Sequence, residues 1–134
     1  GKLNVNDLEN KQTKFSGYQN YNNTKLYNAL FTKYLSTQLK DFGITVNCLH
    51  PGVVKTSLFD TAGAFARNML ALFMITPEKG AKTSIYLASS PDVENITGEY
   101  FDKCKVKKAA PIVYDVNAQK SLWDASINLV KKYL

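Results

Sequence analysis

The chain has 134 residues, enough for one small domain or for part of a larger one. With 45% hydrophobic and 21% charged residues, it has the composition of an ordinary globular protein. The net charge of +6 alone would permit nucleic-acid binding, but no interleaving of aromatic and basic residues and no zinc-ligand spacing supports it. We therefore expect solvated lysines and no nucleic-acid partner. Cys48 and Cys104 form no metal or redox motif, so no metal site is expected.

The first 20 residues are rich in amide side chains and have no clear hydrophobic period, which predicts an irregular surface connection. The apolar anchor of this segment consists of Leu3, Val5 and Leu8. We expect Phe15, Tyr18 and Tyr21 to cover the entry to the helix that follows.

A helix is predicted from Tyr21 to about Phe42. Its apolar residues follow the i, i+3, i+4, i+7 spacing of one buried stripe. They are Leu26, Tyr27, Leu30, Phe31, Tyr34, Leu35 and Leu39. Gly43 is the expected end of the helix, because glycine readily takes the left-handed conformation that often follows a helix C-terminus.

Tyr21 and Lys25 lie four residues apart, so a helix places them on the same face, one turn apart. An ammonium beside a phenol favours the phenolate, which helps a tyrosine to exchange protons. A free phenol has a pKa of about 10, and bringing it near 7 requires about 4 kcal/mol. One exposed pair contributes less than that, so a second positive charge, such as a bound cofactor, is needed. The alternative is a solvated lysine beside a half-buried tyrosine.

Residues 44–49 form a short β-favouring run between two turn signals, which predicts a strand. A helix, a tight turn and a strand make half of a βαβ unit and indicate a parallel sheet. Ligands of such sheets bind beyond the carboxyl ends of the strands, which places residues 50–56 at the expected site. There Gly52 permits close backbone approach, Pro51 stiffens the turn, and the backbone near Val54 and the Thr56 hydroxyl offer hydrogen bonds. The alternative is an ordinary strand-to-loop turn.

Residues 62–75 are unusually apolar but too few to span a bilayer. They could form a lid over a hydrophobic substrate, a membrane-surface contact or plain core. Thr76-Pro77-Glu78 then has the pattern of a helix start, with an N-cap, a proline at N1 and an acid in the first turn. That helix is predicted to run to about Ser89 and to end before Pro91.

Residues 96–101 are predicted to form a second short strand. Residues 105–115 form a basic stretch that we expect to be irregular. Asp115 or Asn117 is the expected cap of a last helix, whose apolar residues are spaced for burial on one face. They are Leu122, Trp123, Ile127, Val130 and Leu134.

Together these motifs resemble the C-terminal half of a short-chain dehydrogenase/reductase. In chain order they are Tyr21-x-x-x-Lys25, Gly43-Ile44-Thr45-Val46-Asn47, His50-Pro51-Gly52-Val53-Val54-Lys55-Thr56 and Gly98-Glu99-Tyr100-Phe101. The likeness to the retinol dehydrogenase branch rests on residues 49–54, 100–105 and 118–126. The resemblance covers the chain from about Tyr18 onward. It implies an α/β fold, the C-terminal part of a doubly wound, Rossmann-type parallel sheet that is incomplete in this chain.

The resemblance implies an oxidoreductase that transfers a hydride between a nicotinamide cofactor and a lipophilic alcohol or carbonyl such as retinol or retinal. The cofactor would be NADP or NAD, with NADP favoured. Tyr21 resembles the general acid/base of the family, and Lys25 would stabilise the phenolate and bind the nicotinamide ribose. The oxidised nicotinamide would supply the second positive charge, and residues 57–75 would form a substrate lid. The residues that would line the nicotinamide and hold its carboxamide are Pro51, Gly52, Val54 and Thr56.

Three features of the family have no match in this sequence: the Gly-x-x-x-Gly-x-Gly phosphate turn, the catalytic serine and the residues that select the cofactor. Ser16 is the only serine before Tyr21 and lies too close to it to match the family spacing. We therefore expect residues 1–134 to be the C-terminal fragment of one domain, inactive without an N-terminal cofactor-binding half. The alternatives are a non-catalytic binding or regulatory protein on the same fold, and a reductase of steroids or other carbonyls.

The resemblance also implies an intracellular protein, either cytoplasmic or associated with the endoplasmic-reticulum membrane. Membrane attachment would use the absent segment or residues 62–75. A homodimer would form through the helices at 21–42 and 77–89. The expected small-molecule partner is a lipophilic substrate.

Overall fold

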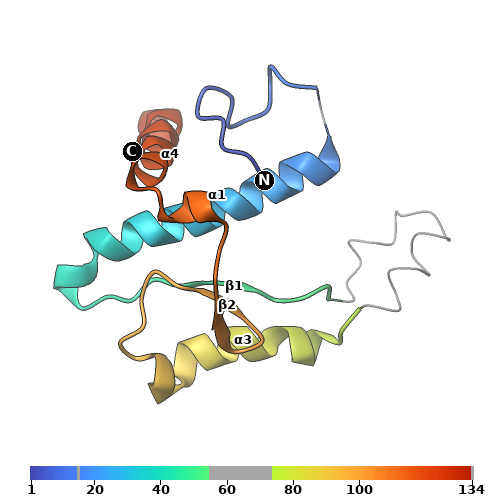
Figure 1. Ribbon diagram of the computed structural model, residues 1–134, viewed down its shortest axis with the longest axis vertical. Coiled ribbons are helices and arrows are strands. Elements are labelled where there is room, and N and C mark those ends of the chain that lie inside the picture. The colour runs from blue at the N-terminus through green and yellow to red at the C-terminus, as the bar shows by residue number, and fades with distance from the viewer. Residues whose placement is uncertain (15, 55–73, 134) are drawn as a thin grey trace. The chain divides into compact units, whose positions relative to one another are not determined.

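The computed structural model describes residues 1–14, 16–54 and 74–133 (Figure 1). Contacts divide the chain into two compact units. The first comprises residues 1–48, 96–99 and 108–134, and the second comprises residues 49–95 and 100–107. Thr56, and the apolar run as far as residue 73, lie outside the described residues.

Helix α1 (Gly17–Gln38) is the main element of the first unit. It begins at Gly17 rather than at Tyr21 because Ser16 caps it, its hydroxyl oxygen accepting a hydrogen bond from the Gln19 N–H at 3.4 Å. The 3₁₀ turn η1 (Lys40–Phe42) follows, and Gly43 then has a φ of +68°. The left-handed glycine predicted at the end of this segment is therefore confirmed.

The core of the first unit lies where α1 packs against α4 (Val116–Val130) and the 3₁₀ turn η4 (Pro111–Tyr114). Leu30 of α1 is fully buried. Around it pack Leu26, Ala29, Val113 and Leu122. Burial of these side chains removes apolar surface from water and is the main favourable contribution to the packing of the two helices.

One of the two caps expected for the last helix, α4, is confirmed. The Asp115 side chain accepts hydrogen bonds from the backbone N–H groups of Asn117 and Ala118, so Asp115 is the N-cap of α4 and Asn117 lies inside the helix. Of the apolar residues expected to be buried, Leu122 is 3% exposed, but Ile127 and Val130 are 38% and 43% exposed. The predicted stripe is therefore buried only near the start of the helix, which ends at the 3₁₀ turn η5 (Lys131–Tyr133).

The N-terminal segment confirms the predicted irregular connection, and its Leu3 and Leu8 pack against the core of the first unit. The prediction that aromatic side chains cover the entry to α1 is wrong for the two that the structure describes. Tyr18 is 80% exposed and Tyr21 is 53% exposed, because both lie on the outward face of the first turns of α1. Phe15 lies outside the described residues.

Three short strands form a sheet in the order β1-β2-β3. They are β1 (Cys48–His50), β2 (Tyr100–Asp102) and β3 (Lys105–Lys107). Gly98 N–H donates to the Val46 carbonyl and Cys48 N–H donates to the Glu99 carbonyl, so both segments advance in the same direction and run parallel. β2 and β3 pair antiparallel, with Phe101 opposite Val106.

The predicted strands at 44–49 and 96–101 are wrong in their bounds, because side chains replace part of the backbone ladder before β1 and β2. Val46 N–H donates to the Thr97 hydroxyl at 2.9 Å. The Asn47 carboxamide donates to the Ile96 carbonyl at 2.7 Å and accepts from the Glu99 N–H at 3.0 Å. Regular pairing therefore starts only at Cys48 and Tyr100.

The expectation of an irregular stretch at 105–115 is wrong at its start, where residues 105–107 form β3. The hairpin between β2 and β3 turns through Lys103 and Cys104, whose φ values are +51° and +59°. Two left-handed residues in a two-residue turn match the twist of an antiparallel pair. The turn residues Lys103-Cys104 are not the Asn-Gly or Asp-Gly pair typical of such turns, so no sequence pattern predicts the hairpin.

Helix α3 (Pro77–Ser89) confirms its predicted bounds, its Thr76 cap and Pro77 at the first position. It belongs to the second unit and packs against the hairpin through the rings of Tyr86 and Phe101, whose centroids lie 6.4 Å apart. The 3₁₀ turn η3 (Pro91–Val93) follows it. The mixed helix and strand content and the partly parallel sheet confirm the predicted α/β class, part of a Rossmann-type fold.

Candidate active site

The predicted Tyr21–Lys25 pair is present on the first turns of α1. The Lys25 Nζ atom lies 5.4 Å from the centroid of the Tyr21 ring. A cation at this distance from an aromatic face is attracted to it, and it keeps a positive charge close to the phenol. Among the described residues no hydrogen bond engages the Tyr21 hydroxyl and no carboxylate pairs with Lys25. Both groups are therefore available to a ligand.

Asn23 fixes the turn of α1 that carries this pair. Its side chain is 8% exposed, and its Oδ1 atom accepts hydrogen bonds from the Lys2 N–H at 2.7 Å and from the Gln19 amide at 2.8 Å. The N-terminal segment is thereby tied to the helix between Tyr21 and Lys25. Sequence reasoning missed this role, because a buried amide in a helix has no spacing that marks it.

The loop after β1 holds three of the residues predicted to line the nicotinamide. Gly52 has a φ of +84°, and a Cβ atom added there would lie 2.8 Å from the Ile75 Cδ1 atom. The Ile75 N–H donates to the Val53 carbonyl at 2.9 Å, and Val54 forms a parallel bridge with Ile75. Gly52 therefore has a conformation that side chains disfavour, and the close approach of a ligand to its backbone stays a prediction.

Helix α3 packs closely against the same loop at Gly80. A Cβ atom added at Gly80 would lie 2.5 Å from the Val54 Cγ2 atom and 3.6 Å from the Pro51 carbonyl oxygen. A β-branched valine has little freedom to move away. The absence of a side chain at position 80 therefore sets how closely α3 approaches the loop.

The loop also forms one wall of a pocket of about 480 Å³ in the second unit. The other walls come from α3 and from the β2–β3 hairpin. The pocket is lined by His50, Pro51, Gly52, Val53, Ile75, Lys79, Lys82, Thr83, Asp102, Lys103 and Cys104. Pro51 and Gly52 thus border a cavity, as expected for residues beyond the carboxyl end of a strand, whereas Val54 packs against α3.

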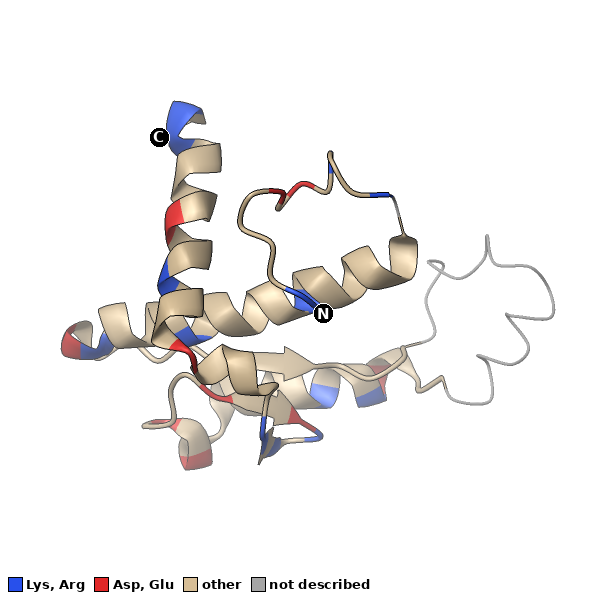
Figure 2. Cartoon of the chain, turned by 45° about the horizontal axis from the view of Figure 1, so that its top comes forward, with Lys and Arg blue, Asp and Glu red and all other residues tan. Residues whose placement is uncertain are grey.

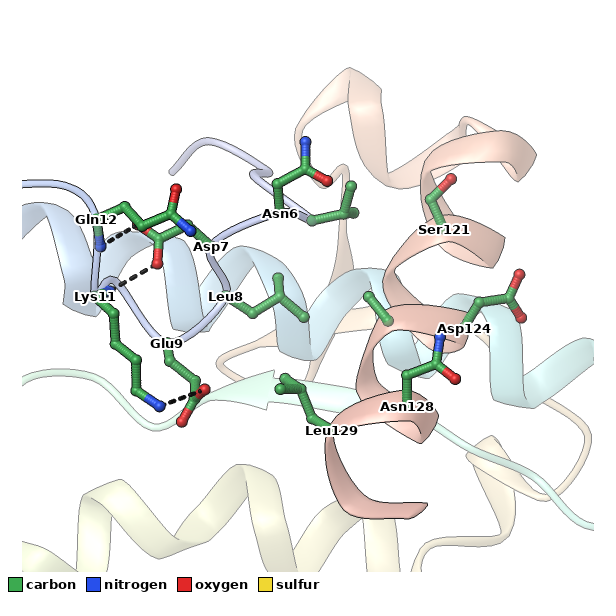
Figure 3. Close-up of a pocket in the computed structure, with 12 residues that line it drawn as sticks. Asn6, Asp7, Leu8, Glu9, Lys11, Gln12, Ser121, Asp124, Asn128 and Leu129 are labelled. Atoms are coloured by element: carbon green, nitrogen blue, oxygen red, sulfur yellow. Dashed lines mark hydrogen bonds and ion pairs between the residues drawn. The ribbon is translucent and has the colours of Figure 1, made fainter. Parts of the chain in front are cut away.

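A larger hollow of about 620 Å³ lies in the first unit, between the N-terminal segment and α4 (Figure 3). Its charged side chains are already engaged within the protein. Asp7 accepts hydrogen bonds from backbone N–H groups, Glu9 pairs with Lys11 at 2.9 Å, and Asp124 pairs with Lys120 at 2.6 Å. We therefore assign no catalytic role to this hollow despite its size.

The structure brings the predicted site residues together in two groups. Tyr21 and Lys25 meet within the first unit, and Pro51, Gly52 and Val54 meet within the second. That both groups serve one cofactor stays a prediction of the resemblance. Among residues 1–14, 16–54 and 74–133, no cluster of acidic, cysteine or histidine side chains could hold a metal ion. No helix within these ranges is long and apolar enough to cross a membrane.

The described residues combine a Tyr-x-x-x-Lys helix with a strand and a Pro-Gly loop in a partly parallel sheet, which defines a protein of the α/β, Rossmann-type class. The family model described as Enoyl-(Acyl carrier protein) reductase matches residues 5–102. The chain therefore belongs to the short-chain dehydrogenase/reductase family.

The chain is similar to several curated members of this family. Retinol dehydrogenase 14 of Mus musculus is 41% identical over 132 residues, covering 94% of this chain and 39% of that protein. Retinol dehydrogenase 13 of Mus musculus is 37% identical over 138 residues, covering 97% and 41%. Short-chain dehydrogenase TIC 32 A, chloroplastic, of Brassica napus is 35% identical over 130 residues, covering 93% and 41%. The chain spans about two fifths of the length of these relatives.

Proposed function

We propose that the full-length protein is a nicotinamide-dependent oxidoreductase that interconverts a lipophilic alcohol and its carbonyl, with retinol and retinal as the substrate pair. The observation that carries the proposal is the Tyr21–Lys25 pair, solvent-accessible and without an internal partner among the described residues. The printed names of the retinol dehydrogenase relatives support the substrate class. The family resemblance favours NADP over NAD.

In this proposal the chain's own groups handle the proton. When bound, the nicotinamide donates or accepts the hydride. The Tyr21 hydroxyl gives its proton to the carbonyl oxygen during reduction and takes it back during oxidation. The Lys25 ammonium beside the ring stabilises the negative charge that Tyr21 carries after giving up the proton. Lys25 also has three N–H donors, which suit the ribose hydroxyls of the cofactor.

The donor set fits such a cofactor. The Lys25 ammonium, which no carboxylate pairs with in the part of the chain that the structure describes, can donate to hydroxyls, and the Pro51-Gly52 loop presents backbone at the edge of a cavity. The test is reduction of all-trans-retinal by the full-length protein with NADPH. Tyr21→Phe is expected to lower kcat by about 100-fold or more, the contribution typical of general acid catalysis. Binding of NADPH is expected to change by less than about twofold, because Phe keeps the ring beside Lys25.

Tyr18→Phe is the matched control, since Tyr18 lies on the same helix, is 80% exposed and is expected to keep normal turnover. Normal turnover in Tyr21→Phe would defeat the assigned role. A steroid ketone tested in parallel separates the substrate classes: faster turnover of the steroid would replace retinal in the proposal. Tight NADPH binding without turnover of either compound by the unsubstituted protein would favour a binding or regulatory role.

A further inference from the structure

The pocket of the second unit carries an excess of positive groups. Lys79, Lys82 and Lys103 line it, against the carboxylate of Asp102. In Figure 2, blue positions mark lysines on α3 and on the β2–β3 hairpin. Among residues 1–14, 16–54 and 74–133, no carboxylate forms an ion pair with these three lysines. Like charges around one cavity repel each other unless an anion lies between them.

The two elements that supply the lysines are fixed to each other. The Cys104 N–H donates to the Thr83 hydroxyl at 3.2 Å, and Thr83 is only 4% exposed. Thr83 directly follows Lys82, and Cys104 directly follows Lys103, so this hydrogen bond holds the backbones of both lysines beside the pocket. Lys79 and Lys82 lie three residues apart and share one face of α3. The backbones that carry these lysines are therefore fixed before any ligand arrives, which lowers part of the entropic cost of binding.

We propose that this pocket binds the phosphate group of a small organic molecule. Lysine ammonium groups act as point charges that suit phosphate oxygens approaching from several directions. The volume of about 480 Å³ falls within the range of small-molecule sites and exceeds what an inorganic anion alone would fill. Pro51, Val53 and Ile75 add apolar lining for the organic part. The pocket shares Pro51 and Gly52 with the loop that the proposed function assigns to the cofactor, but its lysines have no part in that assignment.

The test uses inorganic pyrophosphate as the probe, titrated calorimetrically into the intact protein at an ionic strength held constant with sodium chloride. The native protein is expected to show a saturable site that depends on the pocket lysines, besides binding at the phosphate turn of the cofactor-binding half. Lys79→Gln combined with Lys82→Gln is expected to weaken binding by about tenfold or more, because two charge-assisted contacts are lost. Lys103→Gln is expected to weaken it by about threefold to tenfold. These substitutions are on the surface, so circular dichroism should show an unchanged fold.

Lys105→Gln is the matched control, since Lys105 lies on the same hairpin, is exposed and does not line the pocket. Its affinity for pyrophosphate is expected to stay within about twofold of the native value. Equal affinity in the control and in the pocket variants would overturn the proposal, as would no saturable binding by the native protein.

The source of the phosphate is separated by repeating the titration with saturating NADP⁺ present. Unchanged pyrophosphate affinity would mean that the pocket serves a separate phosphorylated molecule. Competition, with weaker NADP⁺ binding in Lys79→Gln/Lys82→Gln, would mean that the pocket takes a phosphate of the cofactor. Both results support a phosphate site.

Discussion

The carboxamide of Asn47 accepts a hydrogen bond from the backbone N–H of Glu99 at 3.0 Å. The same side chain donates to the Ile96 carbonyl at 2.7 Å, so one side chain satisfies two backbone groups on the neighbouring segment. These two hydrogen bonds set the register between the residues just before β1 and the residues just before β2. β1 then leads directly to the Pro51-Gly52 loop.

We expect Asn47→Ala to destabilise the protein by about 1–3 kcal/mol, because two partly buried backbone groups lose their partner. Urea unfolding followed by circular dichroism measures this. Asn128→Ala, at an exposed position of α4, is the control and should change stability by less than about 0.5 kcal/mol. Equal free energies of unfolding for the two variants would show that water replaces the Asn47 hydrogen bonds without loss of stability.

The approach of α3 to the Pro51-Gly52 loop gives a second prediction. Alanine favours a helix over glycine by about 1 kcal/mol, but the added Cβ at position 80 would lie 2.5 Å from the Val54 Cγ2 atom. We expect the overlap to outweigh the helix preference, so that Gly80→Ala destabilises by about 1 kcal/mol net. Thermal unfolding should show a lower Tm.

A double-mutant cycle identifies the cause. In a Val54→Ala background the added methyl group finds space, so Gly80→Ala should become neutral or stabilising. A Gly80→Ala cost that is the same in both backgrounds would mean that Val54 is not the group that limits the approach of the helix.

The N-terminal segment should respond to acid through Asp7. Burial favours the uncharged acid, but N–H groups of Lys11, Gln12 and Thr13 and the Thr13 hydroxyl donate to the carboxylate, and together they hold the pKa of Asp7 below its usual value. A lowered folded-state pKa means that this stabilisation is complete above the unfolded-state pKa of about 3.9 and is lost as the pH falls through the folded-state value.

We therefore expect Asp7→Asn to have a lower Tm than the native protein at pH 7, and the difference to shrink as the pH falls below about 4. Thermal unfolding measured from neutral to acid pH gives both curves. Glu9→Gln is the control, because Glu9 is exposed and pairs with the exposed Lys11. A difference in Tm between the native protein and Asp7→Asn that stays the same at every pH would contradict the role of the Asp7 charge.

The Cys48 thiol should react slowly with alkylating reagents. Burial raises the pKa of the Cys48 thiol, and the nearby Glu99 charge raises it further, while a hydrogen bond with Thr32 partly offsets both. Because only the thiolate reacts, alkylation of Cys48 by iodoacetamide at pH 8 should be slower than that of glutathione. Mass spectrometry of a Cys104→Ser variant isolates this rate. In urea the rate should rise to that of a free thiol, and equal rates in folded and unfolded protein would refute the explanation.

The helices were predictable from the sequence because their signals are local. Thr76-Pro77 and Asp115 start helices through contacts within one turn, and the Leu26–Leu30 spacing marks the buried face of α1. The placement of Tyr21 and Lys25 on one face of α1 was predictable for the same reason.

The rest depends on contacts between distant parts of the chain. The late start of β1 follows from Asn47 bonding across to Ile96 and Glu99, which no local pattern encodes. The hairpin at Lys103-Cys104 lacks the usual turn residues. The lysine-lined pocket joins residues near 50, 80 and 103, so composition alone presents these lysines as scattered solvated charges.

The two edges of the sheet differ in a way that bears on self-association. β3 ends the sheet on one side, and all three of its residues are exposed, with Lys105 and Lys107 flanking Val106. A second copy that aligned its own β3 there would bring lysines against lysines, which discourages strand addition and fibril growth along this edge. β1 ends the described sheet on the other side, is half-buried and carries no lysine. A strand joining this sheet would thus be directed to β1, and the protein's colloidal stability should fall if the β3 lysines were neutralised.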